Sequence, residues 1–134
     1  MDNSHSSVPI NRIEGFERGF RVWGREDEGI SLKLWLMGYR CYVLPDVKIQ
    51  HVFRSGSPPF RITWEDVNYN LMRMAYSHFN VKRIGKCKKL IKFSNPLLIE
   101  ELVLESDVLE QRRKYFERRI NDDDWYMRKF GIVF

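Results

Sequence analysis

The sequence predicts a helix-rich α/β (α+β) fold with two short strands and a helical C-terminal extension. The two strand candidates, residues 39–45 and 47–53, are rich in β-branched and aromatic residues, and the turn signal Pro45–Asp46 separates them. From residue 61 onward, apolar residues recur at helical spacing and no further strand pattern occurs. Two strands make a poor sheet alone, so we expect them to need partners that this chain does not contain.

Length and composition indicate one folded domain. The chain has 134 residues, of which 43% are apolar and 14% aromatic, and this excludes disorder along the whole length. No apolar run is long enough to span a membrane and the first ten residues lack a signal-peptide pattern, so we expect a cytoplasmic protein. The net charge of +5 favours anionic partners: nucleotides, phosphates, nucleic acid or a membrane surface.

The first predicted helix runs from about Asp27 to Met37. Apolar residues recur at i, i+4 and i+7 from Ile30 to Met37, and Gly38 is a natural left-handed end. Asp27 or a neighbouring acid is suited to cap this helix, because carboxylates bind the free N–H groups of a first turn. Residues 11–20 before it are expected to form a compact loop.

The clearest helix in the sequence lies within residues 61–80. Thr63 and Asp66 resemble a capping box with a shorter acid, and they mark its start. Two apolar stripes run along it, which implies burial on both sides and a central position. The other predicted helices are a basic one over 81–91, one long or two shorter ones over 94–120, and a short one from about Asn121.

The stretch "WGREDEGI" at residues 23–30 sets a tryptophan and a glycine before adjacent acids. With its surroundings it resembles the C-terminal half of the catalytic domain in GT-A glycosyltransferases, namely the family 2 enzymes and the galactosyl- and N-acetylgalactosaminyltransferases. That resemblance covers about forty residues closely. The matching residues are Gly15, Phe16, Trp23, Gly24, Glu26, Asp27, Ser31, Lys33, Trp35, Gly38, Pro45, His51, Val52, Phe53 and Arg54.

The resemblance implies an enzyme that moves a sugar from a nucleotide diphosphate to an acceptor hydroxyl. A divalent metal, Mn²⁺ or Mg²⁺, would neutralise the leaving diphosphate in the intact enzyme. His51 matches a histidine that is often a metal ligand in the family, and Arg54 is placed to clamp a donor phosphate. The alternative for His51 is a structural histidine at the end of a strand.

The adjacent acids are the predicted catalytic residues. Glu26 or Asp27 would take the proton from the acceptor hydroxyl in an inverting enzyme. Trp23 would offer an apolar face to the acceptor, and Gly24 would let the backbone approach closely. Arg25 replaces the second glycine of the family's Trp-Gly-Gly and adds bulk and charge beside this acceptor pocket. The alternative is that Glu26 and Asp27 only cap a helix.

The resemblance divides the chain into a flexible N-terminus at 1–10, a catalytic segment at 11–60 and a helical extension at 61–134. The family's nucleotide-binding half and its DxD motif have no counterpart here. "DDDW" at 122–125 satisfies DxD only as a string, because it follows helices rather than a strand. We therefore expect an isolated chain that is inactive and holds no metal.

Three hypotheses follow for the chain as a whole. It is a segment of a larger glycosyltransferase, or a non-catalytic module that binds a glycan or another subunit, or a basic nucleic-acid-binding domain. The last is disfavoured, since aromatic residues do not alternate with the charges of the basic cluster. Membrane-surface binding by the basic-aromatic stretch at 112–119 is left open. Unpaired strand edges would favour self-association.

Overall fold

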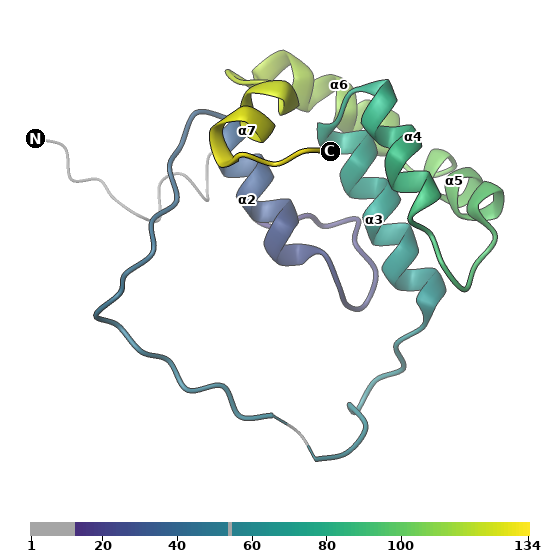
Figure 1. Cartoon of the computed structure of the whole chain (residues 1–134). Coiled ribbons are helices and arrows are strands. Elements are labelled where there is room, and N and C mark those ends of the chain that lie inside the picture. Colours follow the sequence, from purple (N-terminus) through teal and green to yellow (C-terminus); the bar gives the residue numbers. More distant parts are fainter. Residues whose placement is uncertain (1–12, 54) are drawn as a thin grey trace, which may run out of the picture.

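The computed structural model of the chain describes residues 13–53 and 55–134, and this part is all-helical (Figure 1). Within it there are six helices and no strand, so the predicted α/β class is wrong. No helix among these residues is both long and apolar enough to cross a membrane. The helices are α2 (Glu26–Leu36), α3 (Trp64–His78), α4 (Val81–Lys89), α5 (Pro96–Leu104), α6 (Val108–Arg118) and α7 (Asp123–Phe130).

In place of the two predicted strands, residues 39–53 and 55–62 form an extended segment, which arcs away from the helices (Figure 1). The turn expected at Pro45–Asp46 does form, and the Val47 N–H donates to the Leu44 carbonyl at 3.1 Å. The segments on either side of it do not pair with each other. High β propensity specifies a strand only where a partner strand completes the backbone hydrogen bonds, and no described residue supplies one.

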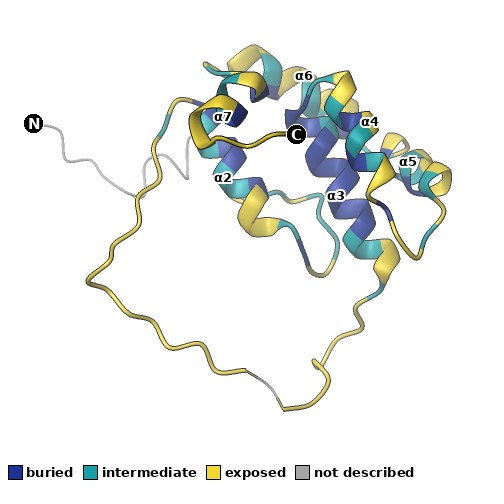
Figure 2. Ribbon diagram, viewed as in Figure 1, coloured by how far each residue is buried: buried dark blue, intermediate teal, exposed yellow. Residues whose placement is uncertain are grey.

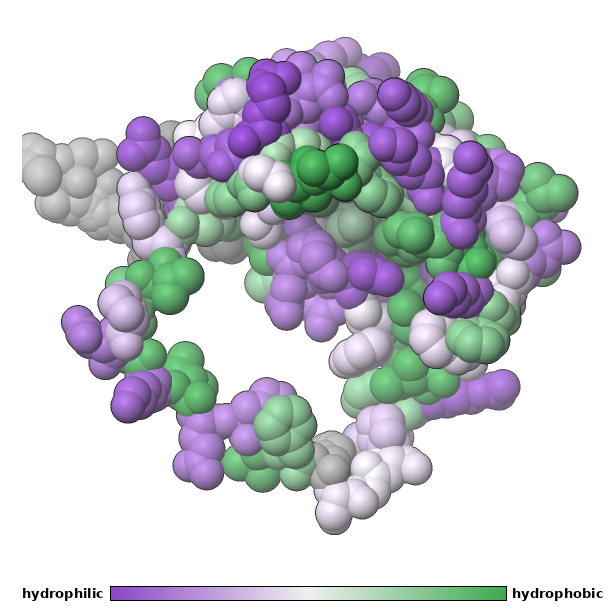
Figure 3. Space-filling view, viewed as in Figure 1, coloured by the Kyte–Doolittle hydropathy of each residue, from purple (hydrophilic) through white to green (hydrophobic). Residues whose placement is uncertain are grey.

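The extended segment is exposed along almost its whole length (Figure 2). Apolar side chains are exposed with the rest of it: Val43 is 88% and Ile49 89% accessible to solvent. In the space-filling view, apolar and polar side chains follow one another along the segment (Figure 3). Beyond Tyr39, which packs against the cluster of Ile13, Met37 and Tyr115, it therefore adds no described side chain to the hydrophobic core and leaves an apolar surface uncovered.

Helix α3 is the centre of the structure, as its two apolar stripes predict. It contacts α2, α4, α5 and α6, and Met72 and Ala75 are fully buried in the core. Thr63 caps it as expected, because the Thr63 hydroxyl accepts a hydrogen bond from the Asp66 N–H at 3.1 Å. Burial on both faces makes α3 the support for the loops that precede α2.

Side-chain caps start the later helices. Asn80, Asn95 and Asp122 each accept a backbone N–H at the start of α4, α5 and α7. The region predicted as one long or two shorter helices contains two, α5 and α6. Helix α7 packs on α2, where Trp35 lies beside Trp125 with ring centroids 6.3 Å apart.

Candidate functional site

The site is built around the sharp turn that leads into α2. Gly24 and Arg25 both have positive φ, at 105° and 69°, and α2 begins directly after them at Glu26. Arg25 is the N-cap residue, but its side chain makes no capping hydrogen bond. The left-handed region is ordinary for glycine and costs energy for arginine, so the turn is strained at the position where the family pattern has its second glycine.

The turn separates the two adjacent acids into different roles. The Glu26 carboxylate accepts the Gly24 N–H at 2.9 Å and so closes the turn from inside the first helical turn. Asp27 is exposed and makes no ion pair or side-chain hydrogen bond with any described residue. Both acids lie where the helix dipole favours negative charge. Glu26 therefore holds the turn before the helix, and neither acid caps an N–H of the first turn of α2. Asp27 is the carboxylate left free.

Five of the predicted site residues line one pocket of about 300 Å³, which we call the turn pocket. The residues that line it are Trp23, Gly24, Arg25, Glu26, Asp27, Glu28 and Val67. Trp23 is half exposed at this pocket, and Arg25 forms an ion pair with Glu28 at 3.3 Å. The structure thus brings the predicted acids and the predicted acceptor-binding residues together.

Asn70 on α3 holds the turn in place, and the sequence analysis did not identify it. Its side chain is fully buried. The side-chain oxygen accepts the Arg21 N–H at 2.7 Å, and the amide group donates to the carbonyls of Arg21, Trp23 and Gly24 at 2.7, 3.0 and 3.1 Å. An asparagine within an apolar helix is the only sequence signal for this role, because buried polar groups need partners.

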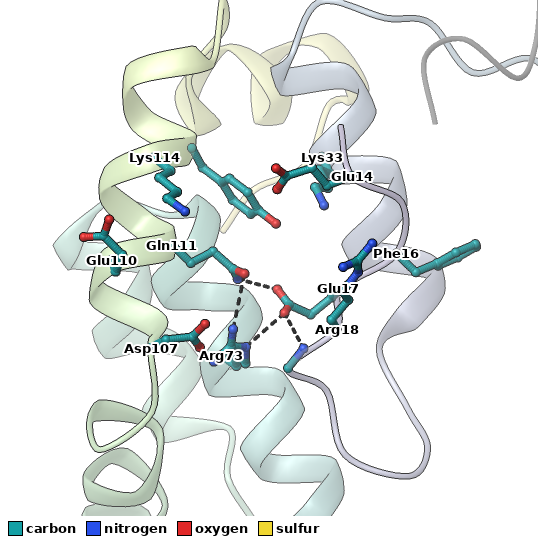
Figure 4. Close-up of a pocket in the computed structure, with 12 residues that line it drawn as sticks. Glu14, Phe16, Glu17, Arg18, Lys33, Arg73, Asp107, Glu110, Gln111 and Lys114 are labelled. Carbon is teal, nitrogen blue, oxygen red and sulfur yellow. Dashed lines mark hydrogen bonds and ion pairs between the residues drawn. The ribbon is translucent and has the colours of Figure 1, made fainter. Parts of the chain in front are cut away.

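The loop before the turn is held by a second buried network on the same helix (Figure 4). Glu17, the acid that follows Gly15 and Phe16, pairs with Arg73 at 3.1 Å. It also accepts a hydrogen bond from Gln111 of α6. The Arg73 guanidinium is 2% exposed and also binds Asp107 at 2.8 Å. Glu17 and Arg73 therefore attach the loop to α3 and α6.

The predicted metal ligand, His51, does not line the turn pocket. His51 lies on the extended segment, where its ring contacts the Phe53 ring with centroids 4.2 Å apart. Arg54 lies outside the described residues. No group of three or more His, Cys, Asp or Glu side chains among residues 13–53 and 55–134 is arranged to hold a metal.

Comparison with known proteins finds distant similarity to one group of transferases. No protein-family model and no solved structure matches the chain. The chain is 36% identical over 59 residues to polypeptide N-acetylgalactosaminyltransferase 8 of Drosophila melanogaster, which is 44% of this chain and 10% of that protein. It is 24% identical over 114 residues to polypeptide N-acetylgalactosaminyltransferase 5 of Rattus norvegicus, which is 84% of this chain and 12% of that protein.

The chain is distantly similar to the polypeptide N-acetylgalactosaminyltransferases. A match to N-acetylgalactosaminyltransferase 6 of Drosophila melanogaster, 23% identical, covers 90% of this chain and 17% of that protein. A match of that extent must include the Trp23–Asp27 turn and His51, wherever it begins. The resemblance inferred from the motif is therefore confirmed as a partial one, since the chain spans a tenth to a sixth of these transferases.

Proposed function

We propose that this chain is a segment of a glycosyltransferase that forms the acceptor side of its active site. The intact enzyme would transfer a sugar from a nucleotide diphosphate donor to an acceptor hydroxyl. The observation that carries this proposal is the turn pocket, in which a free carboxylate, Asp27, lies beside the half-exposed Trp23. The similarity to N-acetylgalactosaminyltransferases supports a sugar as the group transferred and a polypeptide as an acceptor.

Within the proposal, Asp27 is the group that binds the acceptor hydroxyl. As the hydroxyl oxygen bonds to the anomeric carbon and the nucleoside diphosphate leaves, the Asp27 carboxylate accepts the hydroxyl proton. The indole of Trp23 supplies an apolar face for the acceptor, and Glu26 fixes the turn through the Gly24 N–H. Arg25 and its partner Glu28 bound the pocket and limit the size of the acceptor.

The donor side is not formed by the side chains described here. His51 alone supplies one ligand, which is too few to hold Mn²⁺ or Mg²⁺. It belongs to no group of three or more possible metal ligands among the described residues. We therefore assign no step in this chain to a metal. In the intact enzyme a divalent cation would stabilise the leaving diphosphate, and further parts of the protein would have to supply its other ligands.

A chimeric enzyme tests the proposal. The matching segment of Drosophila polypeptide N-acetylgalactosaminyltransferase 8 is replaced by this chain, and transfer of N-acetylgalactosamine to a polypeptide is measured. We expect the chimera to be active and Asp27→Asn to lower kcat by about 10²-fold or more. Glu101→Gln, an exposed acid on α5 that does not line the turn pocket, is the matched control and should retain most of the activity.

Two outcomes would count against the proposal. A chimera that folds but transfers nothing would show that the segment is not equivalent to its counterpart. Equal losses in Asp27→Asn and Glu101→Gln would show that Asp27 has no specific role. The anomeric configuration of the product, read by NMR, then separates two roles for Asp27: inversion supports a general base, and retention leaves it as a hydroxyl-binding group.

A further inference from the structure

A second pocket lies between the loop at 14–19, α2 and α6, and its lining is built from charged groups (Figure 4). We call it the α6 pocket; its volume is about 310 Å³, which is within the range of small-molecule sites. It shares no lining residue with the turn pocket. The proposed transfer reaction does not use it, although two residues of the sequence motif, Phe16 and Lys33, line it.

The floor of the α6 pocket is a buried ammonium group with unused hydrogen-bond donors. Lys33 is 3% exposed, and its Nζ donates to the Gly15 carbonyl at 2.9 Å. An ammonium has three N–H donors, so two remain. Lys33 forms no ion pair with any described residue, and burial, the largest influence on it, lowers its pKa. A buried cation without a paired anion is unfavourable, and a bound anion would relieve that cost.

The hydroxyl of a buried tyrosine accompanies Lys33 in the floor. Tyr115 of α6 is 5% exposed and lines the pocket, and the Lys33 Nζ lies 5.0 Å from the centre of its ring. Its hydroxyl makes no hydrogen bond with any described residue. No buried side-chain oxygen or nitrogen in the described part of the chain lacks a hydrogen-bond partner, so this hydroxyl oxygen reaches the open space of the pocket, where a ligand can bind it.

Two more cations line the rim without partners. Arg18 from the loop and Lys114 from α6 are both exposed, and neither makes an ion pair or side-chain hydrogen bond within the described part of the chain. They come from elements far apart in sequence and face one space with Lys33 (Figure 4). Repulsion between these like charges raises the electrostatic energy of the pocket, and an anion bound between them would lower it.

The charge of the lining sets the charge of the ligand. Its cations are Arg18, Lys33, Arg73 and Lys114, and its acids are Glu14, Glu17, Asp107 and Glu110. Three of these acids are already paired, Glu17 and Asp107 with Arg73 and Glu110 with Arg113, which lies outside the pocket. Four cations and four acids make the lining neutral in sum, and its cations without an ion pair are Arg18, Lys33 and Lys114. Such a lining favours a ligand with a single negative charge over a phosphate dianion, which would face Glu14 and Glu17.

From this arrangement we infer that the α6 pocket binds a carboxylate ligand, through Lys33, Arg18 and Lys114, with the Tyr115 hydroxyl as a further partner. This site goes beyond the proposed sugar transfer and does not depend on it. The carboxylate belongs to a sugar acid or to an acidic side chain of a polypeptide. Both offer two oxygens that accept from ammonium and guanidinium groups.

The test is calorimetric titration of the full chain with four small probes. These are glucuronate, its neutral analogue glucose, N-acetylglutamate α-amide and inorganic phosphate. We expect at least one of the two carboxylates to bind and glucose and phosphate not to; which carboxylate binds identifies its source. Equal binding of glucose and glucuronate, phosphate binding without carboxylate binding, or no binding by either carboxylate would each overturn the inference.

Variants locate the binding. Arg18→Gln and Lys114→Gln remove exposed charges and should each weaken binding about 2- to 10-fold, the range for partly exposed charged pairs. Lys82→Gln, an exposed charge on α4, is the matched control, and Asp27→Asn tests the turn pocket; neither should change the affinity. Lys33→Met should abolish binding. Unchanged affinity in both Arg18→Gln and Lys114→Gln, or loss in Asp27→Asn, would place the ligand elsewhere and overturn the inference.

NMR gives a second readout that does not require a folded Lys33 variant. Amide shifts on addition of the bound carboxylate should change at Gly15 and Gly19, which border the α6 pocket, and not at Gly24 in the turn pocket. Shifts confined to Gly24 would contradict the assignment. Because this readout is binding rather than transfer, it holds whether or not the chimeric enzyme is active.

Discussion

Arg25 is the residue at which this chain departs most clearly from the pattern it resembles. Its φ of 69° lies in the left-handed region, where an L side chain is disfavoured, and its guanidinium binds only Glu28 on the surface. The turn is thus kept in the shape that a glycine would adopt without strain. Arg25 therefore places a charged side chain at the edge of the turn pocket while its backbone holds a conformation of higher energy.

This strain can be measured with two variants of Arg25. Both Arg25→Gly and Arg25→Ala remove the ion pair, but only glycine relieves the left-handed strain. We expect the free energy of unfolding in urea to be about 1 kcal/mol higher for Arg25→Gly than for Arg25→Ala.

The same pair of substitutions at an exposed helical position provides the control. Glu101 lies within α5, where glycine is the poorer residue, so Glu101→Gly should be less stable than Glu101→Ala by about 1 kcal/mol. If Arg25→Gly were also the less stable of its pair, the left-handed turn would not form in solution as described.

Helices could be predicted from this sequence more reliably than strands, because helix signals are local. The positions of α3, α5 and α7 follow from apolar periodicity and from Thr, Asn and Asp caps, and these signals act within a few residues. The strands at 39–53 could not be predicted in the same way, because a strand exists only through a neighbour. Their β-rich composition is real, but the described residues complete no sheet.

The candidate site was predictable to a similar degree. Trp23 through Asp27 are contiguous, so the turn that gathers them is local, and the motif identified them. Asn70 was missed because its partners lie 46 to 49 residues away in sequence, and only the packing of α3 brings them together. His51 was predicted as a metal ligand, but it lies on the exposed extended segment and belongs to no group of three or more possible ligands among the described residues.

Helix α3 also carries a group that links its packing to pH. The ring of His78 is stacked on Tyr115 of α6 with centroids 5.4 Å apart. Burial, with further contributions from Lys33 and Arg119, lowers the pKa of His78 from 6.5 to about 3. The unfolded chain therefore binds a proton at this histidine at a pH where the folded chain does not.

The sign of this pKa change gives a prediction. Stability from neutral His78 is complete above pH 6.5 and is lost as the pH falls toward 3. We expect the free energy of unfolding to fall by about 1.5 to 2 kcal/mol between pH 6.5 and about 5 from this group. His78→Phe should remove that part of the slope in urea titrations.

His51 provides the matched control, since its ring lies on the exposed segment rather than in the core. His51→Gln should leave the slope of stability against pH as it is in the native chain. A slope for His78→Phe that matches the native one would mean that His78 is accessible to protons in the folded state.

For the molecule as a whole, the extended segment is the main source of uncovered apolar surface. Tyr42, Val43, Ile49, Val52 and Phe53 are each at least 75% exposed. Surfaces of this kind in soluble proteins are normally covered by another chain or another part of the same chain. We therefore retain self-association as a prediction, with exposed side chains rather than strand edges as its cause.

Sedimentation across a range of concentrations checks this prediction. We expect the native chain to form dimers or larger species, and Val43→Lys with Ile49→Lys to shift it toward the monomer. Gln50→Lys, which adds the same charge to the same segment without removing an apolar group, should have a smaller effect. A native chain that stays monomeric at every concentration would show that the segment does not drive association.

The buried guanidinium of Arg73 has a consequence for how this chain can vary. It fills the space where a side chain at residue 19 would begin, and Glu17, Ser106, Asp107 and Gln111 keep it there. A methyl group at residue 19 would therefore displace an arginine that four partners restrain. Gly19 and Arg73 should covary among relatives of this chain, and a damaging Gly19→Ala should be rescued in a genetic screen by a smaller residue at position 73.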